Sequence, residues 1–204
     1  MKQMIIVNPG FYTTVQDKGR TGYQEFGIPV SGAMDDYSFR IANILVGNDE
    51  YEAVLEATLT GPEIYFETDA VVSIAGANMI PRINGRIAPM WRSLKVSAGD
   101  MLSFNMAREG ARSYIAVAGG MDIPAVMGSR STYVRGAIGG ISGRKLESGD
   151  RINLMDCGAG FQELVNRRVP RQCIPEYRGY YRIRAVPGPQ DDCFTEDSIE
   201  KFFN

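Results

Sequence analysis

The sequence of 204 residues contains no histidine, and this absence excludes several kinds of active site. A Ser-His-Asp triad, a Cys-His pair and any metal site with a histidine ligand cannot be built within this chain. Acid–base chemistry must therefore use carboxylates, lysine, tyrosine, cysteine or a group from outside the chain.

The chain also has few cysteines, a small net charge and no long apolar run. Cys157, Cys173 and Cys193 are odd in number and far apart, which is not the pattern of a disulfide framework or a metal knuckle. The apolar run near the start is too short for a signal peptide or a membrane span. A net charge of -2 gives no electrostatic reason to expect nucleic acid or an anionic membrane as a partner. We expect a protein of the reducing cytoplasm without a metal.

Short β-strands separated by turns dominate the rest of the chain. There are 23 glycines and 10 prolines, which supply turns at close intervals. Runs rich in β-branched and aromatic residues predict strands at 4–8, 11–16, 53–59, 63–68, 70–76, 100–106, 112–120, 150–156 and 180–188. This pattern favours an antiparallel barrel or sandwich over a doubly wound parallel sheet.

Two helices are expected. Residues 34–48 have apolar side chains at helical spacing, with Asp35 and Asp36 at the start and Gly47 at the end. Residues 195–204 form the second, with Thr195 as its cap. Phe202 and Phe203 need a partner to bury against, which suggests a chain cut short or one part of a longer protein. The alternative is a docked C-terminal helix.

The loop that precedes the first helix is unusually rich in polar groups. Arg20 can fork onto a carboxylate or phosphate, Asp17 can orient Arg20 or act as an acid or base, and Gln16 can both donate and accept. Ser31 lies near a helix start, where anions are favoured. The structural alternative is that Asp17 and Arg20 pair with each other and that Ser31 is a helix cap.

Four further stretches attract attention, each with a simpler alternative. Residues 129–132 place four polar groups beside a glycine, either as an anion site or as a turn. Glu56 interrupts an apolar strand, where it faces solvent or has a raised pKa if buried. Residues 136–149 contain five glycines, as a mobile loop over a ligand or as a linker. Residues 167–184 hold six arginines, as a solvated face or an anion site.

Several of these stretches together resemble a known family. They read QDKGRTGYQEFGIPVSGAMD, ANILVGN, LEATLTGPEI, SIAGAN, YIAVAGGMDIPAVMGSRSTY and VPGPQDDCF. In this order they are similar to the biotin-dependent carboxyltransferase family, also called allophanate hydrolase subunit 2, which includes the C subunits of 5-oxoprolinases.

The resemblance implies a mainly β fold, a cyclophilin-like antiparallel β-barrel with few short helices. It implies a cyclophilin-like domain over residues 1–185 and, at 186–204, the start of a truncated second subdomain. It also implies a subunit of an ATP-dependent 5-oxoprolinase complex that converts 5-oxoproline to glutamate. Its partners would be an allophanate hydrolase subunit 1-like protein (the B subunit) and an A-type subunit. The alternatives are the carboxyltransferase component of a urea carboxylase, or a non-catalytic antagonist of a sporulation-kinase inhibitor.

The family's distinctive polar positions carry over to this chain as expected site residues. The resemblance implies catalytic roles for Asp17, Arg20 and Glu56, and substrate-binding roles for Gln16, Ser31, Asp35, Asn43, Ser129, Arg130, Thr132 and Gln190. The sequence has neither a biotin-attachment Met-Lys-Met motif nor a Walker motif. We therefore expect no cofactor on this chain, with ATP used by the complex, or biotin in the carboxyltransferase alternative.

Overall fold

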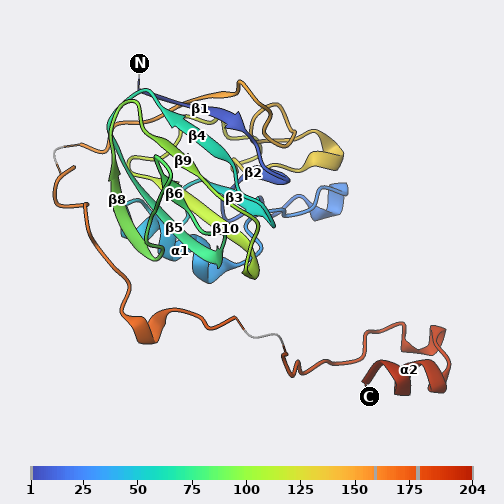
Figure 1. Cartoon of the computed structure of the whole chain (residues 1–204). Coiled ribbons are helices and arrows are strands. Elements are labelled where there is room, and N and C mark those ends of the chain that lie inside the picture. The colour runs from blue at the N-terminus through green and yellow to red at the C-terminus, as the bar shows by residue number, and fades with distance from the viewer. Residues whose placement is uncertain (1, 159, 178–179, 204) are drawn as a thin grey trace.

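The fold consists of antiparallel strands in two sheets. The computed structural model describes residues 2–158, 160–177 and 180–203. The six-stranded sheet has the order β11-β1-β4-β9-β6-β7, and the five-stranded sheet has the order β2-β3-β10-β5-β8 (Figure 1). The strands are β1 (Gln3–Asn8), β2 (Tyr12–Gln16), β3 (Val54–Thr58), β4 (Glu63–Phe66), β5 (Ala70–Asn78), β6 (Arg82–Ile83), β7 (Arg86–Ile87), β8 (Arg92–Val96), β9 (Met101–Ser103), β10 (Glu109–Val117) and β11 (Arg151–Asn153).

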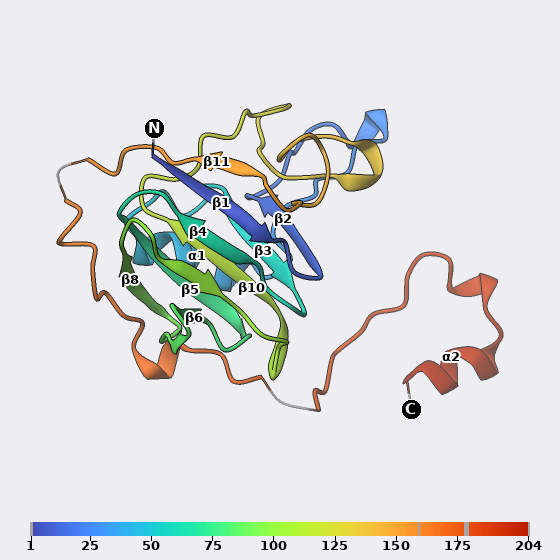
Figure 2. The same ribbon diagram turned by 45° about the horizontal axis from the view of Figure 1, so that its top comes forward.

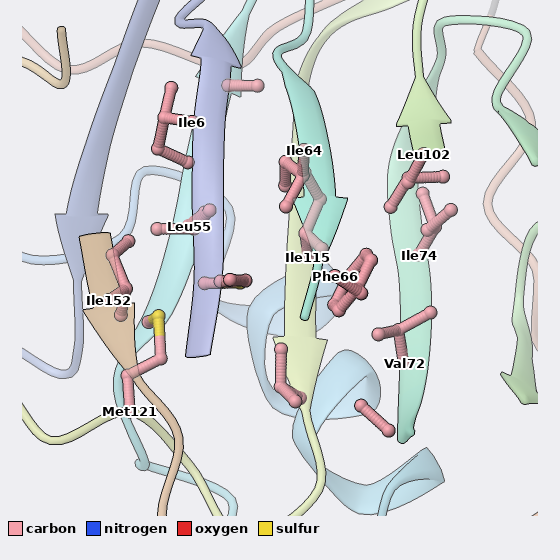
Figure 3. Close-up of a cluster of buried hydrophobic side chains, with 14 of the residues drawn as sticks. Ile6, Leu55, Ile64, Phe66, Val72, Ile74, Leu102, Ile115, Met121 and Ile152 are labelled. Carbon is pink, nitrogen blue, oxygen red and sulfur yellow. The ribbon is translucent and has the colours of Figure 1, made fainter. Parts of the chain in front are cut away.

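The main hydrophobic core lies between the two sheets. Alternate residues of each strand point inward, so that Met4 and Ile6 of β1 are fully buried while Val7 is exposed. Figure 3 shows Phe66 and Leu102 from one sheet beside Ile74 from the other. Fully burying each such side chain contributes about 1.5–3 kcal/mol, which explains why the sheets pack face to face.

A second apolar cluster forms where helix α1 (Asp36–Leu45) covers the outer face of the five-stranded sheet (Figure 1). Phe39 and Ala42 of α1 are buried against Val54 of β3 and Tyr114 of β10. The helix begins at its cap residue Asp35 and ends before Gly47, which has the left-handed φ of 75° that glycine tolerates. This packing holds the N-terminal end of α1 above β3 and β10.

The predicted fold class is confirmed. The fold is mainly β and antiparallel, and its α-helices are short. The strands predicted before residue 157 are all present with shifted ends, whereas β6, β7 and β8 were not predicted. Neither α-helix in the described part of the chain has the length and apolar content that crossing a membrane requires.

The C-terminal segment differs from its prediction at one point. Residues 180–188 form no strand, so the strand predicted there is wrong. All of these residues are exposed, and strand-like alternation stabilises a strand only where another strand and a buried face are available. The segment leads away from the sheets to helix α2 (Glu196–Phe203), whose residues are not buried (Figures 1 and 2). The hydroxyl of Thr195 caps α2 as predicted, by accepting from Ser198 N–H at 3.3 Å, while Asn204 lies outside the described residues.

Candidate functional site

The candidate site lies on the face of the five-stranded sheet that α1 covers, where the loop after β2 crosses it. In the antiparallel register Thr14 of β2 lies opposite Glu56 of β3, and Glu56 lies opposite Tyr114 of β10. Directly paired residues project to the same face, so these three side chains form one polar row. Two hydrogen-bonded clusters are built around this row.

The first is the Asp17 cluster, in which one buried carboxylate joins two loops. The Asp17 carboxylate accepts from Gly19 N–H at 2.7 Å and, at 2.6 Å each, from Ser129 Oγ, Ser131 Oγ and Arg130 N–H. Figures 1 and 2 show the blue loop after β2 beside the gold segment that follows β10. One donor comes from the loop after β2 and three come from residues 129–131. The Asp17 carboxylate therefore joins these two loops by hydrogen bonds.

The same contacts set the acidity of Asp17. Burial by itself raises the pKa of a carboxyl group, because it disfavours the charged form. The hydrogen bonds from Ser129, Ser131 and the two backbone N–H groups favour the carboxylate and outweigh burial, so the pKa of Asp17 is lowered. The side chain is thus a buried anion at neutral pH.

The two arginines near this carboxylate have different surroundings. Arg20 does not form the predicted pair with Asp17; its side chain is 1% exposed and donates through Nη2 to the Ser131 carbonyl. Arg130 donates through Nε to the Ile123 carbonyl at 2.8 Å and through Nη1 to Glu52 at 3.1 Å. The Arg130 guanidinium therefore already has a carboxylate partner.

Gln16 and Thr132 extend the Asp17 cluster along β2. Gln16 Nε2 donates to Thr14 Oγ1 at 3.0 Å and to the Thr132 carbonyl at 3.2 Å. Thr132 donates to the Val15 carbonyl through its N–H at 2.9 Å and its hydroxyl at 3.0 Å. The segment at 129–132 thereby covers the outer edge of β2.

The second is the Glu56 cluster, which attaches the start of α1 to the sheet. Glu56 Oε2 accepts from Met34 N–H at 2.8 Å and from the Tyr114 hydroxyl at 2.9 Å, and Arg112 Nε lies 3.5 Å from Oε1. Tyr114 in turn accepts from Asp35 N–H at 2.8 Å. Burial first, and then the charge of Glu56, raise the pKa of Tyr114 far above its ordinary range. Glu56 is buried at this cluster and does not face solvent.

A pocket of about 460 Å³ opens beside the Glu56 cluster. Its lining comes from the start of α1, from the beginning of β10 and from Tyr177 and Tyr181. Arg112 is its cationic wall and Asp35 its anionic wall. The pocket gives a solvent-accessible approach to the residues around Glu56.

Asp35, an expected substrate-binding residue, is the helix cap of α1. Its carboxylate accepts from Ser38 N–H at 3.0 Å and from Ser38 Oγ at 2.6 Å. Ser31 does not fill this position, so its alternative assignment as the cap is wrong; it has a left-handed φ of 58° in the turn before Gly32.

Asp35→Ala is expected to lower the free energy of unfolding by about 1 kcal/mol, because an N–H of the first helical turn loses its acceptor. Urea denaturation measures this change. Asp36→Ala is the matched control, since Asp36 makes only an exposed ion pair with Arg40. An equal loss in both variants would show that the cap is not the stabilising contact.

Two expected site residues lie away from these clusters. Asn43 is buried within α1 and donates through Nδ2 to the Glu52 carbonyl at 2.7 Å, which fixes the turn between α1 and β3. Gln190 lies in the exposed segment before α2 and lines an apolar groove there with Phe194 and Phe202. The other expected residues are brought together at or beside the two clusters.

Sequence reasoning missed several members of the site. Tyr114, Arg112 and Glu52 were not among the expected site residues, and Ser131 was included only as part of the polar stretch at 129–132, although each contacts an expected residue. The signal for Tyr114 and Arg112 is the strand register, which places them beside Glu56. The signal for Ser131 is its place in the polar stretch at 129–132. Among the described residues, no group of three or more cysteine or acidic side chains is placed to hold a metal ion.

The chain matches known proteins over almost its whole length. The model of the family "Carboxyltransferase domain, subdomain A and B" matches residues 26–204. The C subunit of the 5-oxoprolinase of Escherichia coli is 40% identical over 97% of this chain, which spans 62% of that protein. The urea amidolyase of Saccharomyces cerevisiae is 38% identical over 98% of the chain, which spans 11% of it. The urea carboxylase structure of Kluyveromyces lactis aligns with a TM-score of 0.83 at 34% identity, covering 98% of this chain and 19% of that one.

Proposed function

We propose a function from the premise that this chain belongs to the carboxyltransferase family defined by subdomains A and B. The protein is a subunit of an ATP-dependent 5-oxoprolinase complex, and it is inactive without its partner subunits. The observation that carries this proposal is the 40% identity to the C subunit of the Escherichia coli 5-oxoprolinase. The proposed partners are a B-type protein, of the allophanate hydrolase subunit 1 kind, and an A-type protein of the same complex.

The chemistry of the site supports a role in binding and orientation. Opening 5-oxoproline breaks the lactam C–N bond, while water supplies the oxygen of the new carboxylate and a proton to the released amine. The complex couples this hydrolysis to that of ATP. In this proposal ATP is bound by a partner and the chain holds the substrate. Its sequence has no histidine to serve as a base poised near neutral pH. The chain contributes hydrogen-bond donors and acceptors in fixed positions, which lower the barrier by orienting the reactant.

The expected site residues divide into two roles in this proposal. Asp17 and Ser129 are positioning residues, because their side chains bond each other and fix the surrounding loops. Arg20 is the better of the two arginines for an anionic group, because Arg130 is already paired with Glu52. Glu56 is also a positioning residue, because it accepts from Met34 N–H and lies beside Arg112, which lines the pocket at the start of α1.

A second function has its own support. The identity to the urea amidolyase of Saccharomyces cerevisiae is 38%, close to that of the Escherichia coli protein. In this alternative the protein is the carboxyltransferase component of a urea carboxylase, and biotin arrives on another domain or protein. The two functions therefore differ in whether a biotinylated partner is present.

Affinity purification of the full-length protein from its native cells tests this proposal. We expect mass spectrometry to find the A-type and B-type subunits and a streptavidin blot to remain blank. A biotinylated partner in stoichiometric amount would replace the proposal with the carboxyltransferase function. Recovery of a kinase-inhibitor protein alone would contradict both enzyme functions.

A further inference from the structure

Arg20 is a buried cation whose hydrogen-bonding capacity is only partly used. Its side chain is 1% exposed, and in the described part of the chain Nε and Nη1 have no hydrogen-bond partner. No carboxylate among the described residues forms an ion pair with Arg20. The Asp17 carboxylate instead accepts hydrogen bonds from Ser129 and Ser131. A buried charge without a partner lowers the stability of the fold. Buried polar groups that lack partners are therefore candidates for ligand-binding sites.

Gln16 presents an unused acceptor near the same backbone stretch. Its Oε1 is buried and has no partner among the described residues, while Nε2 donates to the Thr132 carbonyl. Arg20 donates to the carbonyl of the preceding residue, Ser131. Both side chains therefore reach the same short segment, and between them they leave a charged donor and a neutral acceptor unpartnered.

The cover loop, residues 139–143, packs directly on Arg20. Gly139 has a φ of 69°, and a Cβ there would overlap the Ser131 carbonyl oxygen and would lie 2.6 Å from Arg20 Nη2, so only glycine fits this approach. Gly140 and Gly143 also have positive φ. The loop therefore meets Arg20 with backbone and presents no carboxylate to it.

A pocket lies along the next residues of the cover loop. It has a volume of about 290 Å³ and is lined by residues 140–142 of the cover loop together with Ile123 and the charged residues Asp122 and Arg151. Ile123 also accepts the hydrogen bond from Arg130 Nε. Gly140 lines this pocket and its neighbour Gly139 packs on Arg20, so the cover loop separates the pocket from Arg20.

We propose that Arg20 is the receptor for a ligand carboxylate, which enters from this pocket when the cover loop moves aside, and that the loop then closes over the bound ligand. The Gln16 amide oxygen accepts the N–H of the same ligand. That the ligand is 5-oxoproline rests on the proposed function, and its chemistry fits: it has one carboxylate and one lactam N–H. Urea has no carboxylate, so this receptor also separates the two candidate substrates.

The test compares three probes on the full-length protein, alone and in its complex, by hydrogen exchange of the cover loop, residues 139–143. The probes are 5-oxoproline, 2-pyrrolidinone, which lacks the carboxylate, and cyclopentanecarboxylate, which lacks the lactam. We expect 5-oxoproline to protect the loop with an affinity roughly tenfold to a hundredfold above that of 2-pyrrolidinone, as charge-assisted hydrogen bonds predict. Cyclopentanecarboxylate should bind between the two. Equal protection by 5-oxoproline and 2-pyrrolidinone would overturn the proposal.

Arg20→Met removes both the charge and the N–H donors, and Arg20→Lys keeps the charge without the planar fork. Both variants should therefore lose most of the preference for the carboxylate. Arg86→Met is the matched control, since Arg86 is exposed on the short strand β7. Retention of the preference in a folded Arg20→Met protein would also overturn the proposal. If these variants do not fold, the comparison of probes on the unchanged protein decides.

The receptor and the proposed function can fail separately. Carboxylate-dependent protection without glutamate formation by the complex would support the receptor and contradict the 5-oxoprolinase function. Glutamate formation with protection that ignores the carboxylate would support the function and overturn the receptor.

Discussion

Asp17→Ala is expected to lower the free energy of unfolding by about 3–5 kcal/mol, because several buried donors lose their charged acceptor and each unsatisfied group costs roughly 1–3 kcal/mol. The substitution leaves Ser129 Oγ, Ser131 Oγ and two backbone N–H groups without their acceptor. It also separates the loop after β2 from residues 129–131. Urea denaturation of the full-length protein measures the loss, and Lys18→Ala, at an exposed neighbouring residue, is the control.

The loss should depend on pH in a defined direction. The pKa of Asp17 is lowered in the folded protein, so the carboxylate stabilises the fold fully above its unfolded pKa of about 3.9. That contribution disappears as the pH falls through the lower, folded pKa. The difference in unfolding free energy between the unchanged protein and Asp17→Ala should therefore shrink as the pH is lowered below about 5. A constant difference would show that the charge of Asp17 is not what holds the loops.

Glu56→Ala is expected to cost about 2–4 kcal/mol, since it leaves the Tyr114 hydroxyl and Met34 N–H without an acceptor. It also leaves Arg112 without its carboxylate partner. The start of α1 then loses one of its links to the sheet. We expect urea denaturation to measure the loss of stability. Hydrogen exchange should show faster opening at residues 34–38, around the start of α1, than in the remainder of this helix.

Tyr114→Phe removes only the hydroxyl that donates to Glu56, so it separates the cost of losing this contact from the cost of losing the contact between Glu56 and Met34 N–H. A double-mutant cycle with Glu56→Ala should give a coupling energy of about 0.5–3 kcal/mol, as for other residues in one network. The raised pKa of Tyr114 means that the folded protein favours the neutral phenol. Its contribution is complete below the unfolded pKa of about 10 and is lost as the pH rises above that value. Additive losses in the cycle would contradict a shared network.

The elements of the fold were predictable where the signal is local. The strands that were predicted before residue 157 follow from β-branched runs and glycine turns, whereas β6, β7 and β8 were not predicted. Helix α1 follows from its apolar spacing and from Asp35 at its start. The strand predicted at 180–188 is wrong because local alternation cannot show whether a partner strand exists. The division at residues 185 and 186 stays a prediction.

The candidate site was predictable as a set of residues but not as a set of contacts. Asp17 and Ser129 were each expected, yet their hydrogen bond spans 112 positions of the chain and depends on how the loops fold. The bond between Tyr114 and Glu56 spans 58 positions and depends on strand register. Arg20 was expected as an anion receptor, but its burial and its unused donors are visible only in the structure. The roles of all expected site residues remain predictions.

The arginine-rich stretch shows how packing decides between a solvated face and a site. Ser93 N–H donates to the Arg167 carbonyl at 2.9 Å, and Arg168 bridges to Arg92, so the first part of the stretch lines the edge of β8. Arg182 and Arg184 are exposed, and Arg178 lies outside the described residues. The solvated alternative therefore describes Arg182 and Arg184, while the backbone at residues 167–168 protects a strand edge.

We propose that this protein completes a 5-oxoprolinase. The most direct test of this proposal is the rate of ATP-dependent glutamate formation from 5-oxoproline by the purified full-length protein with its A-type and B-type partners. We predict turnover by the complete mixture and none when this protein or ATP is left out. Unchanged glutamate formation without this protein, or ATP-dependent consumption of urea with a biotinylated partner in place of 5-oxoproline turnover, would contradict it.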